Sequence, residues 1–220
     1  MIKHIVSSLV LSLVMIGLGK SEVLLDNTFV SPYVNMFTWK VGVTPVDWGG
    51  NRYELGQSFI TGDDLFHNII YQPRFGSTGN GQESFVLSLY SDSNNAPNLL
   101  LGQFSGSAVP TVGSDNLYYL NPSLTLSSST KYWVVAKNDG AGLVDINSTA
   151  DKSISTSNGF TVGDVGIIYN GSWQIVRTVG DPNYQPTVFK LSGSAVPEPS
   201  SLSLLALGGV LVVLGRRKRA

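Results

Sequence analysis

Cysteine is absent from this 220-residue chain, and charged residues make up only 13% of it. Without cysteine there is no disulfide, no thiol nucleophile and no thiolate metal ligand. Histidine is nearly absent too, with only His4 and His67, whereas a zinc site draws on several His or Cys ligands. These absences exclude thiol enzymes and disulfide-stapled domains, and they argue against a zinc site. Stability must therefore come from one hydrophobic core.

The N-terminus is a candidate export signal. A basic start at Lys3 precedes an apolar stretch over 5–18, and small residues follow at Gly19 and Ser21. This order predicts a signal peptide over residues 1–21, cut after one of these two small residues. A retained N-terminal anchor is the alternative, and the shortness of the apolar stretch argues against it.

The C-terminus carries a second apolar run, 202–214, which has a single polar side chain and is followed by a basic cluster. As a helix this run would span about 20 Å, less than the roughly 30 Å of a bilayer core. Basic residues stay in the cytoplasm, so a marginal anchor with the main domain outside is predicted. A permanent single-pass anchor and a buried core helix are the alternatives, and the basic end argues against burial. The cluster consists of Arg216, Arg217, Lys218 and Arg219.

A short proline-containing motif, Val196, Pro197, Glu198 and Pro199, precedes the apolar run. Motif, run and basic end, in this order, resemble the PEP-CTERM sorting signal of Gram-negative bacteria, which also carries the label ice-binding protein C-terminal domain. The resemblance implies that 195–220 is a sorting segment, transiently held in the inner membrane and recognised by an exosortase-type enzyme. It also implies a link to exopolysaccharide and biofilm. Proline disfavours helix in the residue before it, so the motif is expected to be extended.

The segment between the two ends, 22–194, is long enough for one domain and is acidic. It holds eight Lys and Arg against fourteen Asp and Glu, a formal net charge of −6. Nucleic acids and anionic membranes are bound through clustered Lys and Arg. This balance therefore argues against nucleic acid as a partner of the domain.

Short segments rich in β-branched and aromatic residues fill the domain, with turn clusters between them and no helical period. Asn170 and Gly171 separate two such segments and predict a tight hairpin, because both tolerate positive φ. The pattern predicts an all-β fold, a jelly-roll-like β-sandwich. The predicted strands are 66–75, 84–90, 99–104, 131–137, 165–169, 173–179 and 187–191.

Three strand-like motifs occur in a fixed order: Q-S-F-I-T-G at 57–62, S-L-Y-S-D at 88–92 and T-K-Y-W at 130–133. Together they resemble the choice-of-anchor R type of bacterial surface domain. One turn departs from that pattern, because Ala96-Pro97-Asn98 stands where relatives often carry Pro-Gly. The resemblance implies a surface-exposed domain with a swappable C-terminal sorting signal, and it implies no reaction or ligand.

Residues suited to catalysis are few. A secreted glycan hydrolase would have to draw on Glu54, Glu83 or His67, and no G-x-S-x-G elbow accompanies the histidine. Oxygen ligands for calcium occur at 92–95 and near Asp145, but without EF-hand spacing, and ordinary turns account for them equally well. We therefore expect no enzyme activity, no catalytic residue, no cofactor and no metal.

Aromatic residues at loop edges point to a different class, a carbohydrate-binding module. Trp48, Tyr53, Trp173 and Tyr184 lie beside glycines and polar residues, and aromatic rings offer flat faces to sugars. Packing of these rings in the sandwich is the alternative, as expected for Trp133 within a strand pattern. Ice binding would favour a regular Thr ladder, and no T-x-T repeat occurs.

Overall fold

A computed structural model describes residues 21–27, 36–43, 52–78, 84–113, 116–139, 143–149, 154–169, 172–182 and 184–196. The chain divides into two units, Ser21–Ser194 and a second that joins Met1–Lys20 with Ala195–Ala220. Apart from Ala195 and Val196, every described residue belongs to the first unit. The fold reported below is therefore that of the β-domain.

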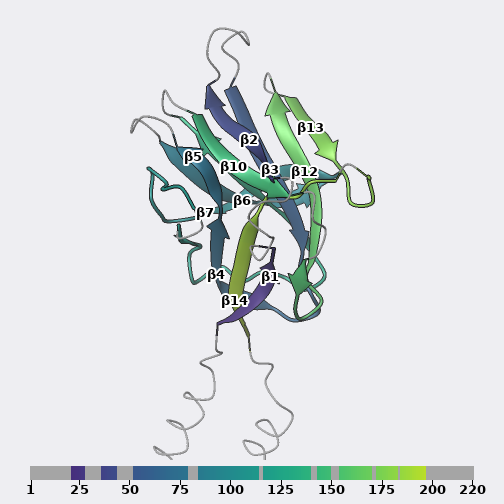
Figure 1. The fold of residues 1–220 in the computed structure, drawn as a ribbon. Coiled ribbons are helices and arrows are strands. Elements are labelled where there is room, and N and C mark those ends of the chain that lie inside the picture. The colour runs from purple at the N-terminus through teal and green to yellow at the C-terminus, as the bar shows by residue number, and fades with distance from the viewer. Residues whose placement is uncertain are drawn as a thin grey trace, which may run out of the picture. The chain divides into compact units, whose positions relative to one another are not determined.

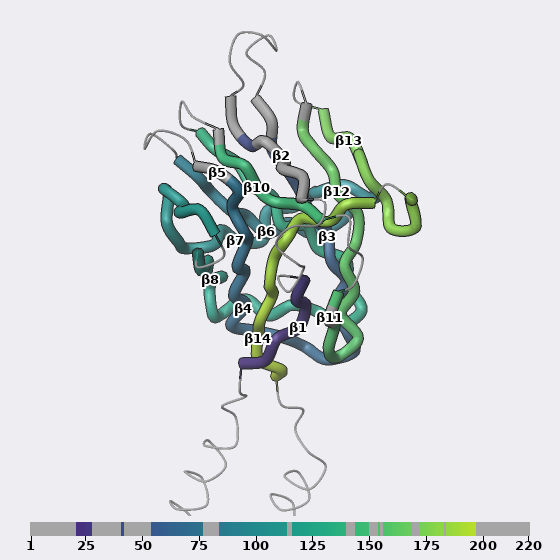
Figure 2. The backbone as a smooth tube through the Cα atoms, viewed as in Figure 1, coloured from purple at the N-terminus to yellow at the C-terminus, as the bar shows by residue number. Residues whose placement is uncertain are grey.

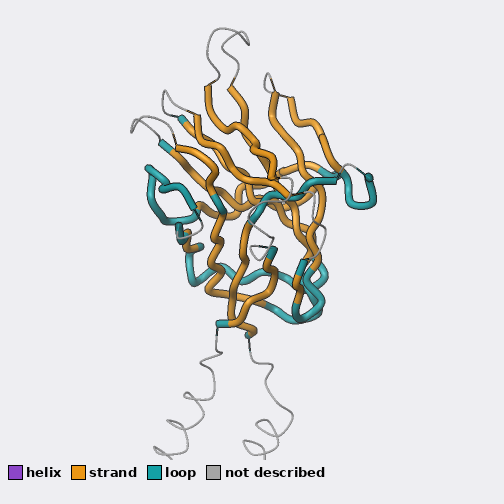
Figure 3. Tube along the Cα trace, in the orientation of Figure 1, coloured by secondary structure: helices purple, strands orange, loops and turns teal. Residues whose placement is uncertain are grey.

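All regular structure in the described residues is β-strand, and no helix occurs among them (Figure 3). Each strand pair with a recorded register is antiparallel. The strands are β1 (Glu22–Asp26), β2 (Met36–Val43), β3 (Arg52–Ile60), β4 (Phe66–Pro73), β5 (Phe75–Thr78), β6 (Phe85–Ser93), β7 (Ala96–Gln103), β8 (Tyr118–Tyr119), β9 (Lys131–Asn138), β10 (Leu143–Thr149), β11 (Ser155–Thr156), β12 (Thr161–Tyr169), β13 (Ser172–Arg177) and β14 (Phe189–Ala195).

Within the described part of the chain these strands form two sheets (Figure 1). The smaller has five strands in the order β11-β1-β14-β4-β8. The larger has nine, and its main path is β5-β10-β2-β3-β9-β6-β7. It branches at β3, which also pairs with β12, and β12 pairs with β13. The predicted all-β class is confirmed, with antiparallel sheets in a sandwich-like arrangement.

Aromatic rings from both sheets meet in one core. Phe59 of β3 stacks on Phe160 with ring centroids 6.3 Å apart, and Phe160 meets Phe66 of β4 edge-on at 4.8 Å. Phe85 of β6 contacts Tyr118 of β8 at 5.7 Å. All five rings are buried. Since the described residues include no disulfide, this apolar burial is the main force that holds the sheets together.

Two expectations about individual segments are wrong. The sequence predicts one strand over 66–75, but it divides at Arg74 into β4 and β5, which belong to different sheets. Pro73 has no N–H to donate, and the Arg74 N–H donates to the Val188 carbonyl at 2.9 Å instead. Turns are expected around Asp145, but this residue lies in β10, which pairs with β2 along its length. Backbone pairing on both sides of β10 outweighs the turn preference of its Asp and Asn.

Two hairpins agree with the turn signals. β12 and β13 pair up to Tyr169 opposite Ser172, as Asn170-Gly171 predicts, although these two joining residues lie outside the described part. The β6–β7 hairpin turns at Asn94 and Asn95, whose φ values are 52° and 62°. Asparagine tolerates this left-handed region, so the pair suits a two-residue turn that matches strand twist.

Candidate functional site

The sorting segment follows a central strand of the smaller sheet. β14 lies between β1 and β4, and β1 is the first strand of the domain. Because β1 and β14 are antiparallel, with Glu22 opposite Gly193, the chain enters and leaves the domain at the same end (Figure 2). β14 ends at Ala195, and Val196 is the last described residue. No separate linker therefore stands between the last strand and the motif.

The rest of both terminal segments lies outside the described residues. In the part of the chain that the structure describes, no helix is long and apolar enough to cross a membrane. The predicted features outside it are the signal peptide up to Lys20, the motif residues Pro197, Glu198 and Pro199, the apolar run 202–214, and Arg216, Arg217, Lys218 and Arg219.

A tryptophan pair lies on the face of the larger sheet that points away from the core. Phe59 points into the core, so Ser58, the preceding residue of β3, points to the opposite face. Trp133 of β9 stands opposite Ser58 and shares this face, yet it is completely buried. Trp173 of β13 covers it, with ring centroids 5.0 Å apart and planes at 82°. β13 also approaches β7, so the sheet curls over this small aromatic cluster.

Two glycines make room for the Trp173 indole. Gly56 of β3 and Gly166 of β12 stand opposite each other. A Cβ atom at Gly56 would lie 2.4 Å from the indole, and one at Gly166 would lie 2.2 Å from it. The ring therefore lies directly on the backbone of two strands. Trp173 is half-buried, and its Nε1 has no hydrogen-bond partner among the described residues.

The other candidate glycan-binding residues are placed differently. Trp48 lies outside the described residues, and only the backbone of Tyr53 is described, in β3 opposite Tyr169. Tyr184 is 5% exposed, and its hydroxyl donates to the Gly163 carbonyl at 2.5 Å. Burial raises the pKa of this phenol well above its usual value. A ring so covered presents no open face to a sugar.

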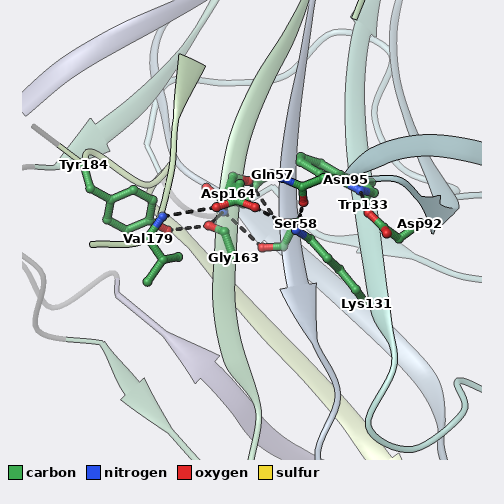
Figure 4. Close-up of polar contacts among 10 residues, drawn as sticks. All are labelled: Gln57, Ser58, Asp92, Asn95, Lys131, Trp133, Gly163, Asp164, Val179 and Tyr184. Carbon is green, nitrogen blue, oxygen red and sulfur yellow. Dashed lines mark hydrogen bonds and ion pairs between the residues drawn. The ribbon is translucent and has the colours of Figure 1, made fainter. Parts of the chain in front are cut away.

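A polar cluster borders Trp133 where β9, β12 and the β6–β7 turn meet (Figure 4). The Lys131 Nζ lies 2.7 Å from Asp164 Oδ2 and also donates to the side-chain oxygen of Asn95. The same Nζ lies 5.1 Å from the centroid of the Trp133 ring. We call Asn95, Lys131 and Asp164 the Lys131 cluster. Sequence reasoning does not predict this cluster, because its members come from three distant segments.

Hydrogen bonds hold Asp164 in the Lys131 cluster. Its Oδ1 accepts the Val179 N–H at 3.1 Å, and its carbonyl accepts the Ser58 hydroxyl at 3.1 Å. Burial raises the pKa of the Asp164 carboxyl, but contacts with Lys131 and Val179 outweigh it and leave the pKa below its usual value. Asp164 is thus a fixed carboxylate with one oxygen directed at the lysine.

Gln57 is a buried polar residue that ties three segments together. Its Nε2 donates to the Gly163 carbonyl at 2.9 Å, and its Oε1 accepts the Thr187 N–H at 3.1 Å. β3 is thereby joined to β12 and to the segment just before β14. The motif at 57–62 marks this residue in the sequence, but its role emerges only from contacts more than a hundred positions away.

The three resemblance motifs lie on the adjacent strands β3, β9 and β6, in that spatial order. Asp92, which ends S-L-Y-S-D, accepts the indole N–H of Trp133, which ends T-K-Y-W, at 2.7 Å. Its neighbour Asn95 contacts Lys131. Side-chain oxygens considered as calcium ligands therefore face a tryptophan and a lysine.

Residues considered for catalysis are spread over the domain. His67 lies on β4 of the smaller sheet and Glu54 on β3 of the larger, while Glu83 lies outside the described part. A search of the described ranges finds no group of three or more His, Asp or Glu residues that could hold a metal ion. Among the described residues the domain thus brings together packing and hydrogen-bonding groups, and the Lys131 cluster lies beside Trp133.

A β-domain joined without a linker to a C-terminal sorting segment is the layout of an exported, processed protein. Residues 195–219 match the family model of the PEP-CTERM protein-sorting motif, which confirms the resemblance drawn from the tail. The match implies export, a membrane-anchoring C-terminal signal and processing by an exosortase-type enzyme. No curated protein matches the chain. For the β-domain, the likeness to the choice-of-anchor R type stays a resemblance carried by three motifs.

Proposed function

We propose that the protein is a non-catalytic component of the cell surface or extracellular matrix, associated with exopolysaccharide. The observation that carries the proposal is the sorting motif at 195–219, attached to the last strand of the β-domain. Such a signal delivers a folded domain outside the cell. The acidic, cysteine-free composition of that domain suits solubility there without disulfides.

The arrangement of polar residues supports the non-catalytic part of this proposal. General acid–base catalysis works best with groups whose pKa lies near the working pH. In the Lys131 cluster the pKa of Asp164 is instead lowered, and the carboxylate is paired with Lys131 of the same chain, so it is not available as an acid or base towards an external substrate. His67 and Glu54 belong to different sheets. A panel of glycans and esters is the direct test, and turnover lost in His67→Ala or Glu54→Gln would contradict the proposal.

Matrix association is tested by fractionating two strains, one that makes exopolysaccharide and one that does not. We expect the wild-type protein in the matrix fraction of the first strain and in the medium of the second. Glu198→Ala serves as the sorting control and should stay with the membranes in both. An identical distribution of the wild-type protein in the two strains would contradict a link to the polysaccharide.

The alternative is a carbohydrate-binding module centred on Trp173. One observation favours it, because the Trp173 indole is only half-buried and packs on Trp133, the ring that the Lys131 amine also approaches. Retention of the full protein on matrix polymer should then fall in Trp173→Ala and in Trp48→Ala. Trp173→Phe should keep part of it. Tyr119→Ala removes an aromatic ring that is 46% exposed on β8 and is the matched control. Unchanged retention in both tryptophan variants would eliminate this function.

A further inference from the structure

The Lys131 cluster brings a primary amine, a carboxamide and a carboxylate into mutual contact. The Lys131 Nζ donates to the side-chain carbonyl of Asn95 and lies 2.7 Å from Asp164 Oδ2. The Asn95 side chain is also hydrogen-bonded to Asp164. Every pair within the cluster is therefore in contact, although the three residues come from β9, the β6–β7 turn and β12.

We propose that Lys131 and Asn95 become joined by an intramolecular isopeptide bond, with Asp164 as the group that transfers protons between them. The amine is the nucleophile, and the carboxamide carbon, Asn95 Cγ, is the electrophile. The bond would be a modification that the chain makes on itself. It needs neither the sorting signal nor an external substrate.

The reaction balances without an oxidant or a co-reactant. The Nζ–Cγ bond forms and the Cγ–Nδ2 bond breaks. The Lys131 ammonium loses two protons, and both leave on the departing nitrogen of Asn95 as an ammonium ion. Asp164 accepts a proton from one nitrogen and delivers it to the other, because its carboxylate contacts both side chains. Asp164 ends the reaction as it began.

The fold holds the three side chains in place for this reaction. The backbone of Asn95 is fixed in the hairpin turn, and Lys131 is the first residue of β9, paired with Ile60 of β3. Hydrogen bonds from Val179 and Ser58 hold Asp164. Groups held in contact in this way react with a very high effective concentration. A reaction that is slow between free side chains can thus run to completion once during maturation.

The surroundings shield the amine and the carboxylate of the cluster from bulk water, whereas Asn95 is exposed at the hairpin turn. The side chain of Lys131 is 20% exposed and that of Asp164 is 14% exposed. Trp133, which is completely buried, lies against the amine. Lys137 is the only other described lysine of β9, and its ion pair is more exposed to solvent. Its ion pair with Asp139 is 39% and 40% exposed, so Lys137 is the natural control.

The bond would cross-link the two ends of the segment between Asn95 and Lys131, which has little regular structure. Between Asn95 and Lys131 the described residues include only β7 and the two-residue β8, and much of this segment is exposed. A cross-link that closes such a loop lowers the entropy of the unfolded chain, as a disulfide does. An exported chain without cysteine has no disulfide for this purpose.

Trypsin gives a direct test on the purified protein, because cleavage follows Lys and Arg. The unmodified chain yields peptides 75–131 and 132–137, since no Lys or Arg occurs between Arg74 and Lys131. An acylated Lys131 resists cleavage. We therefore expect one peptide, 75–137, lighter than its sequence mass by one ammonia molecule, with fragmentation linking Asn95 to Lys131. Recovery of the two separate peptides at full mass would overturn the proposal.

Variants distinguish isopeptide formation from other reactions that release ammonia. Lys131→Arg and Asn95→Ala should abolish the mass loss, Asp164→Asn should abolish or greatly slow it, and Lys137→Arg should leave it intact. A succinimide at an asparagine also loses ammonia, but it would persist in Lys131→Arg, and that result would contradict the isopeptide. The wild-type peptide map decides the matter even if a variant fails to fold.

Discussion

The indole of Trp173 stands edge-on to that of Trp133, with centroids 5.0 Å apart and planes at 82°. This contact buries Trp133 completely on a sheet face that points away from the main core. The β-domain thus has two apolar layers, one between the sheets and a smaller one under β13. The smaller layer depends on close approach of the Trp173 ring to the backbone of β3 and β12.

Gly166→Ala should destabilise the domain by displacing Trp173. Its new Cβ would lie 2.2 Å from the indole, so the ring must move. Overpacking of this kind costs about 1–3 kcal/mol in the free energy of unfolding, measured by urea denaturation. Gly102→Ala on β7, whose Cβ would meet Leu120 at 3.3 Å, is the control with a smaller expected cost. If Trp173→Ala does not reduce the effect of Gly166→Ala, the proposed clash is not its cause.

Gln57→Leu should destabilise the domain more than a surface glutamine does. Leucine has a similar volume but leaves the Thr187 N–H without its acceptor, and the Gly163 carbonyl keeps only the Tyr184 hydroxyl as a side-chain donor. Buried polar groups left unpaired cost about 1–3 kcal/mol each. Gln174→Leu, at an exposed position of β13, should change the free energy of unfolding by less than about 0.5 kcal/mol. Equal effects of the two variants in urea denaturation would refute this role of Gln57.

Replacement of Asp92 tests the hydrogen bond to the buried indole. Asp92→Ala removes the acceptor of the Trp133 N–H, and the orphaned donor should cost about 1–3 kcal/mol. Asp92→Asn keeps a carbonyl acceptor at the same place, so it should retain most of the stability. Thermal unfolding of both variants is the measurement. Equal losses in the two would show that charge, and not the hydrogen bond, is what Asp92 contributes.

Alkaline pH should unfold the domain through its buried phenols. Burial raises the pKa of Tyr71, Tyr118 and Tyr184 above the value of about 10 for an unfolded tyrosine. Their stabilising effect is therefore complete below pH about 10 and is lost as pH rises further. We expect these phenols to ionise only when the domain unfolds. Ultraviolet absorbance measures the ionisation, and circular dichroism measures the unfolding. Ionisation of all nine tyrosines in a domain that is still folded would contradict this prediction.

Strand alternation and turn residues in the sequence predicted the fold class because they are local properties. The pattern at 131–137 predicts a strand, which is β9, and the strands on either side of Asn170-Gly171 pair as a hairpin would. The division at Arg74 escaped prediction because it depends on the carbonyl of Val188, far along the chain. The identity of β10 escaped for the same reason, since its partners β2 and β5 set its conformation.

The candidate sites show the same difference between local features, which the sequence predicts, and contacts between distant residues, which it does not. The sorting motif is contiguous, so the sequence alone predicted it and the family model confirmed it. Trp173 stays a candidate glycan-binding residue, and its packing on Gly56 and Gly166 follows from strand register, which the sequence does not show. The Lys131 cluster joins residues that are 36 and 33 positions apart, and only the folded sheet brings them together.

The proposed function depends on delivery and processing through the tail, so the most direct measurement is the intact mass of the protein recovered from its native host. It should be compared between wild type and Glu198→Ala, together with the cell fraction of each. We predict a wild-type mass that lacks Arg216–Arg219, and a Glu198→Ala variant that keeps them and stays in the membrane. A wild-type chain that retains its basic end in the membrane would contradict sorting by cleavage.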